Sequence, residues 1–201
     1  MPMTIALSCC SKNSQEGSTS NPVTEPPTSS KDPFPVTPGP VDVVIISGQS
    51  NAVGCTAAKC LKDSFDRNYY NKCLHGFEGV GIAYDCWTKD VPVVGSPLYY
   101  SQNHSKNDNF VKVMLGQGNN TSNFGPEIGI ADKLNDTHAG KLFLIKYACG
   151  ASNLRDDWRD RNSPMYPRFI TYVKMQIQNL INKGCTPTIK AFCWMQGEGD
   201  A

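Results

Sequence analysis

Three short blocks of glycine, serine and polar residues hold the side chains that could do chemistry. The first, Ser47–Gly54 (S-G-Q-S-N-A-V-G), places Ser50 two residues after a glycine. A serine hydroxyl on a sharp turn becomes a nucleophile when a base takes its proton, and its backbone N–H can hold an oxyanion. The spacing is not G-x-S-x-G, because Ala52 stands at the second glycine. The alternatives are a tight turn without chemistry and a phosphate-binding loop, but neither glycine-rich nucleotide motif is present.

The other two blocks supply hydrogen-bond donors. In Ala148–Ser152, Gly150 can bring its backbone N–H close to a ligand, and a plain turn is the alternative. In Trp194–Asp200, Gln196 offers an amide donor and Glu198 a carboxylate that can position its surroundings, and a solvated acidic loop is the alternative. The N–H groups of Ser50 and Gly150 together with the Gln196 amide predict a three-donor oxyanion hole.

The elements that must position these blocks are three buried strands. Each block follows an apolar run typical of a strand covered on both faces, namely 41–46, 142–147 and 189–194. Helical patterns lie between them, from Pro126 to about His138 and over roughly 167–183, with Gly184 as the second helix's cap. Alternating strands and helices predict an α/β fold with a doubly wound parallel sheet, whose ligands bind beyond the carboxyl ends of the strands.

The chain divides into a linker and one folded domain. Residues 1–40 are rich in Ser, Thr and Pro and have little to bury, which predicts a disordered segment, either a stalk or a floppy terminus. Residues 41–201 form the domain. Within it, 55–123 has weak periodicity, and we expect a long insertion over the active edge of the sheet. Two disulfides among its four cysteines would stabilise that insertion, and their pairing stays open, whereas Cys149 and Cys193 resemble buried thiols; the four are Cys55, Cys60, Cys73 and Cys86.

Composition restricts the partners and the compartment. The net charge of +1 gives no basic footprint for nucleic acid, and no segment is long and apolar enough to span a membrane. Nine cysteines and four N-x-S/T sequons favour secretion, although an Asn- and Thr-rich chain can generate sequons by chance; these begin at Asn103, Asn119, Asn120 and Asn135. The short apolar run Ile5–Leu7 would be an atypical or incomplete signal. No cysteine and histidine spacing indicates a zinc site.

The blocks, together with Gly125-Pro126-Glu127, resemble the successive motifs of the sialate O-acetylesterase-like domain, a group of SGNH hydrolases that includes the acetylxylan esterases of carbohydrate esterase family 6. The resemblance covers roughly residue 41 to the end, apart from the insertion. It implies a three-layer flavodoxin-like fold and cofactor-free removal of O-acetyl groups from a carbohydrate substrate. It implies that Ser50 attacks the acetyl carbonyl, that Gly150 and Gln196 hold the oxyanion, and that Glu198 supports the site.

The catalytic base is the departure from the family pattern. The family supplies a histidine, with an acid a few residues before it, near the C-terminal end of the domain. This chain has only His75, His104 and His138, and none follows a late strand or stands in Asp-x-x-His. We therefore expect the base and its acid beyond Ala201, an open edge on the sheet, and no activity from these 201 residues alone.

Two other functions are compatible with the same residues. One is a non-catalytic glycan-binding module, in which aromatic rings of the insertion stack on sugars; these are Tyr69, Tyr70, Tyr84, Trp87, Tyr99 and Tyr100. The same rings can instead pack a small core for the insertion. The other is a disulfide-rich surface protein that keeps the esterase motifs as relics. An Asp-x-x-His downstream would favour the enzyme, and the oligomeric state is open.

Overall fold

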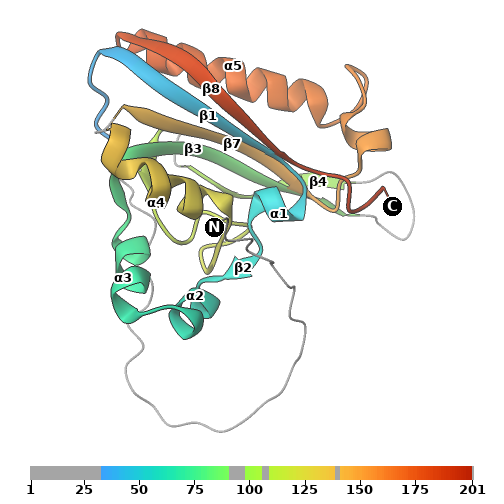
Figure 1. The fold of residues 1–201 in the computed structure, drawn as a ribbon. Helices are drawn as coiled ribbons and strands as arrows, with labels where there is room; N and C mark the ends of the chain where they lie inside the picture. The colour runs from blue at the N-terminus through green and yellow to red at the C-terminus, as the bar shows by residue number, and fades with distance from the viewer. Residues whose placement is uncertain (1–32, 91–97, 106–108, 139–140, 201) are drawn as a thin grey trace, which may run out of the picture.

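The computed structural model describes residues 33–90, 98–105, 109–138 and 141–200 (Figure 1). The strands and helices follow one another as β1 (Gly39–Gly48), α1 (Ser50–Val53), β2 (Thr56–Ala57), α2 (Ala58–Ser64), α3 (Arg67–His75), β3 (Phe77–Asp90), β4 (Leu98–His104), β5 (Val111–Val113), β6 (Asn123–Phe124), α4 (Pro126–His138), β7 (Leu142–Gly150), η2 (Leu154–Trp158), α5 (Tyr166–Asn182) and β8 (Cys185–Met195). The element η2 is a single turn of π-helix.

The central sheet has the strand order β4-β3-β7-β1-β8, and β5 pairs with the first half of β3 on the same side as β4. The strands β3, β7, β1 and β8 are mutually parallel, whereas β4 and β5 run antiparallel to β3. Each long parallel connection carries a helix, α4 before β7 and α5 before β8. The predicted α/β fold with a mainly parallel sheet is therefore confirmed.

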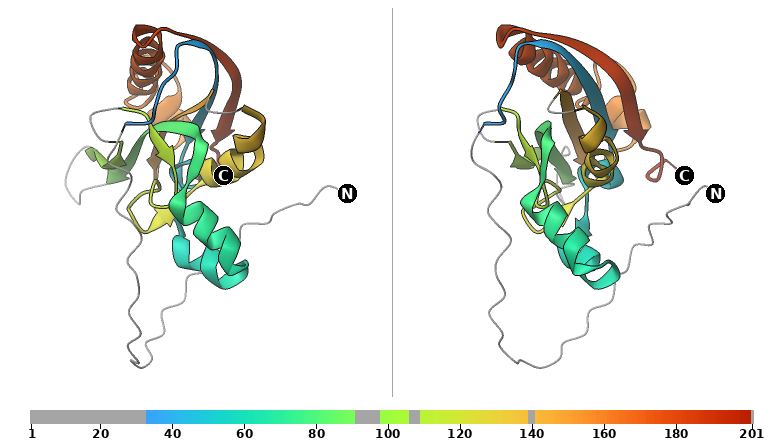
Figure 2. Two further views of the ribbon diagram at one scale, coloured as in Figure 1. Left: turned by 90° about the vertical axis from the view of Figure 1, so that its left-hand side faces the viewer. Right: turned by 60° about the vertical axis from the view of Figure 1, so that its left-hand side comes forward.

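Helices cover both faces of the sheet (Figures 1 and 2). Successive side chains of a strand point to opposite faces, so Val43 and Ile45 of β1 join the core under α5. Val44 and Ile46 of the same strand join the core under α1 and α4. The result is the three-layer, flavodoxin-like arrangement, and it explains why β1 is a continuous apolar run and not an alternating one.

The five elements expected from apolar patterning are present. The strands β1, β7 and β8 contain the predicted runs and extend beyond them at their ends. The helix α4 begins at Pro126, as expected, and α5 occupies Tyr166–Asn182. Gly184 follows α5 with a φ of +81°, and its N–H donates to Ile181 O. A positive φ is readily adopted only by glycine, so this residue ends the helix and turns the chain into β8.

The predicted long, cysteine-containing insertion spans residues 55–123, but its middle is a strand of the central sheet and does not lie over the edge. Phe77–Asp90 forms β3, which pairs with β7 along nine positions, from Val80 with Leu142 to Thr88 with Gly150. The strand has no clear apolar pattern in the sequence, because glycine interrupts it. A Cβ on Gly81 would lie 2.8 Å from the ring of Phe34. The position therefore needs a residue with low strand propensity. The insertion is part of the sheet and shares its core.

The predicted disulfides are not present among the described residues. None of the seven described cysteines takes part in a disulfide. Cys73 and Cys86 are fully buried, and Cys86 Sγ lies 3.7 Å from the carbonyl oxygens of both Val53 and Gln117. In place of the predicted disulfides, hydrophobic burial around β3 stabilises this segment. Cys149 is a buried thiol, as predicted, while Cys193 is partly exposed.

The packed chain begins ahead of residue 41. Phe34 is 4% exposed, and its ring meets that of Phe143 edge-on at 5.7 Å between centroids. Its N–H donates to Phe110 O at 2.7 Å. The rest of the predicted linker, residues 1–32, lies outside the described residues. Among the helices of the described part, none is long and apolar enough to cross a membrane.

A buried ion pair links α4 to the middle of the sheet. Lys146 of β7 and Glu127 of α4 are both 0% exposed, and their charged atoms lie 2.7 Å apart. Lys146 also donates to Gln117 O at 2.8 Å, and Glu127 accepts from the N–H of Gly125 at 2.7 Å. Buried charges are tolerated when they are paired and their remaining hydrogen bonds are made. The pair therefore fixes the start of α4, and the chain just before it, against β7.

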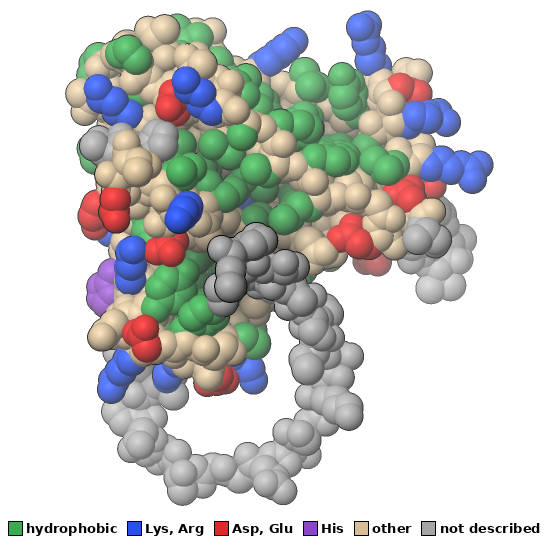
Figure 3. All heavy atoms as spheres, in the orientation of Figure 1, with side chains coloured by type: hydrophobic (Ala, Val, Ile, Leu, Met, Phe, Trp, Pro, Cys, Tyr) green, Lys and Arg blue, Asp and Glu red, His purple; other side chains and the backbone are tan. Residues whose placement is uncertain are grey.

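The strand β8 lies at one edge of the sheet in the described part of the chain. Its side chains toward α5 are partly covered: Phe192 stacks on Phe169 with centroids 5.8 Å apart, and Trp194 meets Trp158 at 5.2 Å. Even so, Phe192 is 52% exposed and Trp194 is 39% exposed. Apolar side chains accordingly gather along this part of the surface (Figure 3). The expected open edge is present at β8.

Candidate active site

The three predicted blocks meet at the carboxyl edge of the sheet. In the registers of β1, β7 and β8, Gly48 pairs with both Ala148 and Met195. Gln49 N donates to Met195 O at 2.8 Å. Gly199 lies between the blocks, because a Cβ built on it would be 3.4 Å from Ser152 O and 3.5 Å from Gln49 Oε1.

Ser50 begins α1 immediately after β1 turns. Gly48 has a φ of +136°, and a Cβ there would lie 1.9 Å from Met195 O. Only glycine can therefore occupy this position, and its geometry lets the chain leave the sheet sharply. The N–H of Gly54 donates to Ser50 O at 2.9 Å, which closes the single helical turn. Ser50 is partly exposed.

Glu198 holds the residues on both sides of Ser50. Its Oε2 accepts from Gln49 Nε2, and its Oε1 accepts from Asn51 Nδ2. Both are hydrogen bonds to a charged acceptor, which are stronger than neutral ones. Gln49 is 5% exposed, so its side chain is fixed by burial as well as by this bond. Glu198 thus clamps the serine turn from the third block.

Gln196 lies beside the second block. Its Nε2 is 3.3 Å from Ser152 O and 3.4 Å from Ser152 Oγ, both long for hydrogen bonds. Ser152 Oγ itself donates to Cys149 O at 2.6 Å and accepts from Trp158 Nε1 at 2.8 Å, so this buried hydroxyl is fully engaged. An amide nitrogen carries two hydrogens, and both contacts of Gln196 Nε2 are directed at Ser152.

The turn after β7 has its unusual conformation at Ala151 and not at Gly150. Gly150 is the last residue of β7, and a Cβ there would meet only ordinary contacts, the nearest being Thr88 Oγ1 at 3.6 Å. The fold thus leaves room for a side chain at Gly150. Ala151 has a φ of 59°, which is uncommon for a residue with a Cβ. Backbone strain of this kind persists only where neighbouring contacts fix the chain.

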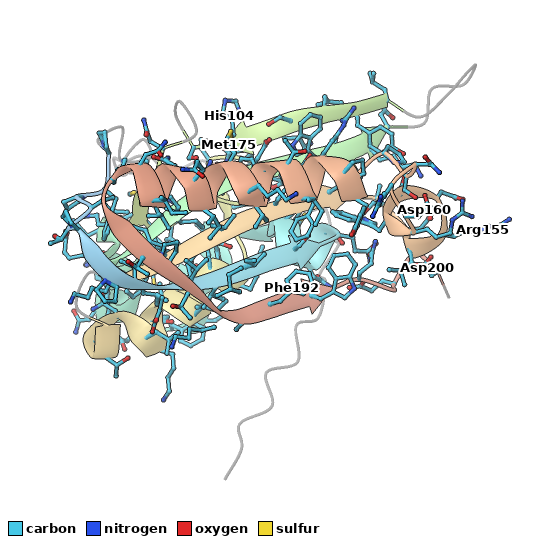
Figure 4. All side chains as sticks on the ribbon, turned by 90° about the horizontal axis from the view of Figure 1, so that it is seen from above. His104, Arg155, Asp160, Met175, Phe192 and Asp200 are labelled. Carbon is cyan, nitrogen blue, oxygen red and sulfur yellow. The ribbon has the colours of Figure 1, made fainter. Side chains whose placement is uncertain are left out.

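Asp200 supplies one of those contacts. Its two carboxylate oxygens accept from Leu154 N at 2.9 and 3.0 Å, and Oδ1 lies 3.4 Å from Arg155 N. Figure 4 shows Asp200 and Arg155 at the same end of the molecule. The two acids of the third block therefore hold different segments: Glu198 holds the serine turn, and Asp200 holds the chain that follows Ala151.

The three histidines lie away from Ser50. His104 ends β4, which is separated from β1 by β3 and β7, so three strand spacings of about 4.8 Å put its backbone roughly 14 Å away. Its Nδ1 lies 3.2 Å from Ser101 Oγ, and Figure 4 shows it across the sheet from Phe192. His75 ends α3 just before β3 begins, at the opposite edge of the sheet. His138 ends α4, about 18 Å along the helix from Pro126.

One buried carboxylate near the site was not predicted. Asp157 of η2 is 0% exposed and accepts from Lys89, Tyr99 and the backbone of Asn153. The sequence offers little signal for it, because Asp156-Asp157 suggests two solvated acids, and its partners come from β3 and β4, inside the predicted insertion. Within the described ranges no three His, Cys, Asp or Glu side chains gather as a metal site.

The fold and the three blocks define the class. A mainly parallel flavodoxin-like sheet with a serine turn, a glycine turn and a Gln-Gly-Glu block at its carboxyl edge is the arrangement of the SGNH hydrolases. The chain belongs to the family described as carbohydrate esterase, sialic acid-specific acetylesterase, whose model matches residues 40–201.

Comparisons with individual proteins do not define the function further. No curated protein matches the chain. A solved structure of a protein from Arabidopsis thaliana, determined by X-ray crystallography at 1.6 Å, is similar with 18% sequence identity and a TM-score of 0.44. The match covers 80% of this chain and 59% of that protein, so the chain spans less than two thirds of its length.

Proposed function

We propose that this protein hydrolyses acetyl esters on carbohydrates through an acyl-enzyme on Ser50. The observation that carries the proposal is the clamp on the serine turn, in which both neighbours of Ser50 donate to Glu198. A clamp on these two residues holds the turn that carries Ser50, and neither of its hydrogen bonds uses the Ser50 hydroxyl. Such preorganisation is what nucleophilic catalysis needs from a scaffold.

The reaction then proceeds in two steps. Ser50 Oγ attacks the acetyl carbonyl carbon while its proton passes to a general base, and the negative charge forms on the carbonyl oxygen. The N–H groups of Ser50 and Gly150 and the Gln196 amide are the donors proposed for that oxygen. The base returns the proton to the departing sugar oxygen, leaving acetyl-Ser50. A water molecule, deprotonated by the same base, attacks this ester, and acetate and free Ser50 result.

The proposal assigns the general base to none of the three histidines of the described chain. Support comes from the positions of the three histidines present, each on an element that ends away from Ser50. A base must lie within hydrogen-bond reach of the hydroxyl, directly or through one water. We accordingly expect the 201 residues by themselves to show no turnover of an aryl acetate.

The test is hydrolysis by the intact protein as the cell makes it. Turnover of an aryl acetate and of acetylated sugars, including sialic acid and xylan esters, is compared between wild type, Ser50→Ala and Ser64→Ala. Ser64 is a matched control, because it is an exposed serine at the end of α2. Loss of activity in Ser50→Ala alone supports the proposal. Undiminished hydrolysis by Ser50→Ala would contradict the proposal. The relative turnover of the different acetylated sugars identifies the substrate.

The glycan-binding module is the weaker candidate. Most of the aromatic rings that could stack on sugars are engaged within the protein. Tyr84 is 1% exposed, Trp87 packs on Tyr147 with centroids 6.2 Å apart, and Tyr99 donates to Asp157. Tyr100 is 43% exposed and stays accessible. Binding of an acetylated glycan without any turnover by the intact protein would favour this module over the enzyme.

We also propose secretion, on the sequons and the cysteine count. The sequon asparagines differ in their surroundings. Asn103 Nδ2 donates to the carbonyl oxygens of Gly116 and Gly118 at 2.9 Å, so its amide is engaged, whereas Asn120 lies exposed in a turn. A glycosidase-sensitive mass on protein recovered from the medium, lost in Asn120→Gln, would support secretion. Retention of the protein inside cells would contradict it.

A further inference from the structure

The buried carboxylate of Asp157 lies behind the turn that follows β7 and has no part in the proposed chemistry. Its side chain is 0% exposed. Three donors converge on it: Lys89 Nζ at 2.9 Å, the Tyr99 hydroxyl, and the backbone N–H of Asn153 at 2.7 Å. A buried carboxylate is stable only when its lone pairs have partners, so the three contacts depend on one another.

Two of the three donors come from one hairpin. Lys89 of β3 and Tyr99 of β4 pair directly across the two strands. Burial, and then the hydrogen bond to Asp157, raise the pKa of Tyr99 above its ordinary value, so the hydroxyl remains a neutral donor. Arg168 of α5 adds a second attachment, with its Cζ 5.0 Å from the ring centre of Trp87 and 5.7 Å from that of Tyr99. The hairpin is therefore held firmly against η2 and α5.

The third donor comes from the strained turn of the second block. Asn153 stands two residues after Ala151, whose φ of 59° requires support from its surroundings. Asp157 fixes the N–H of Asn153, while Asp200 fixes the N–H of Leu154 from the opposite block. Both acceptors act on the single π-helical turn η2 or at its start, and such turns occur frequently at functional sites.

We propose that Asp157 is a positioning residue that ties the β3–β4 hairpin to the turn after β7 and so sets where the Gly150 N–H lies relative to Ser50. This rests on the proposed function, because the N–H matters only if an oxyanion forms there. Contacts that a substrate makes with the hairpin are then transmitted to the oxyanion donors through one carboxylate. The hairpin becomes part of the catalytic apparatus although none of its residues touches the reacting atoms.

The test uses Tyr99→Phe in the intact protein, which removes one donor to Asp157 and keeps the ring. Tyr166→Phe is the matched control, because Tyr166 is an exposed tyrosine at the start of α5. For a small aryl acetate assayed well below the Tm, we expect Tyr99→Phe to lower kcat about threefold to tenfold with KM unchanged, and the lost donor to the buried carboxylate should also lower Tm. Amide hydrogen exchange of the peptide 150–155 should be faster by about fivefold or more, and Tyr166→Phe should change neither quantity.

Further variants separate positioning from simple folding. Lys89→Arg keeps a cation for Asp157 and should retain most of kcat, whereas Lys89→Met should lower kcat and speed exchange in 150–155 as Tyr99→Phe does. Wild-type kcat together with wild-type exchange in Tyr99→Phe would overturn the proposal. If Ser50→Ala retained full hydrolysis, the proposed function would fail, and the exchange measurement alone would decide whether Asp157 fixes the turn.

Discussion

Replacing Glu198 by glutamine tests the clamp on the nucleophile with one change of chemistry and almost none of size. The carboxylate accepts from Gln49 Nε2 and from Asn51 Nδ2. A glutamine at 198 has one acceptor oxygen, and its NH₂ group would face one of these two NH₂ groups. At least one of the two bonds is therefore lost, and a side chain beside Ser50 is released.

The magnitude follows from the surroundings of the two donors. A hydrogen bond to a charged group contributes about 1.5–3 kcal/mol. Gln49 is 5% exposed, whereas Asn51 and Glu198 are exposed, so the lower end of that range applies. If the loss appears in the transition state, about 1.5 kcal/mol corresponds to roughly a tenfold fall in kcat, since each 1.36 kcal/mol is a factor of ten.

The assay is steady-state hydrolysis of an aryl acetate by the intact protein, together with thermal unfolding. Glu198→Gln should lower kcat about tenfold with KM nearly unchanged, because the residue holds the turn and not the substrate, and Tm should fall because a hydrogen bond within the fold is lost. Asp200→Asn is the matched control: its remaining oxygen can still accept from Leu154 N, so we expect less than about a threefold loss. Wild-type kcat in Glu198→Gln would refute the clamp.

Two further outcomes follow from buried groups. Lys146→Met leaves the Glu127 carboxylate buried without its cation and should lower the free energy of unfolding in urea by about 3–5 kcal/mol. The double variant Lys146→Met/Glu127→Gln should recover at least half of that loss, and equal losses in both would contradict the pairing. Burial raises the pKa of Cys86 from 9.0 to about 12, so at pH 8 a thiol reagent should label the exposed Cys55 and Cys60 and spare Cys86 until the protein unfolds. Because the unfolded thiol ionises first, the free energy of unfolding should fall as the pH rises from about 9 toward 12, and a flat profile there would argue against the buried thiol.

The parts of the fold that the sequence predicted are those in which burial produces a continuous signal. β1, β7 and β8 lie between two layers, so they appear as unbroken apolar runs, and the chemistry-bearing blocks follow them directly. β3 lies in the same environment, but its sequence does not form an unbroken apolar run. At Gly81 the ring of Phe34 occupies the space that a side chain would need. That contact joins residues far apart in the chain, and no local pattern encodes it.

For the candidate site, too, the sequence predicted what depends on local patterns and not what depends on contacts between distant elements. The convergence of the three blocks followed from parallel topology alone, since strands that run the same way end at the same edge. The partners of each carboxylate did not follow, because they depend on side-chain reach across elements. Glu127 lies at the start of a predicted helix and Lys146 within a predicted strand, yet they are one buried pair. Asp157 likewise draws its donors from a hairpin that the sequence did not reveal.

The clamp on the serine turn also has a consequence for the timing of synthesis. Gln49 and Asn51 are 149 and 147 residues away from the carboxylate that holds them. At ordinary translation rates, Ser50 is made about 7–30 seconds before its clamp exists. During that interval β1 also lacks β8, its neighbour along ten positions. The growing chain therefore carries Ser50 before the residues that hold its turn, and the proposed ester hydrolysis would require the last block to have been made.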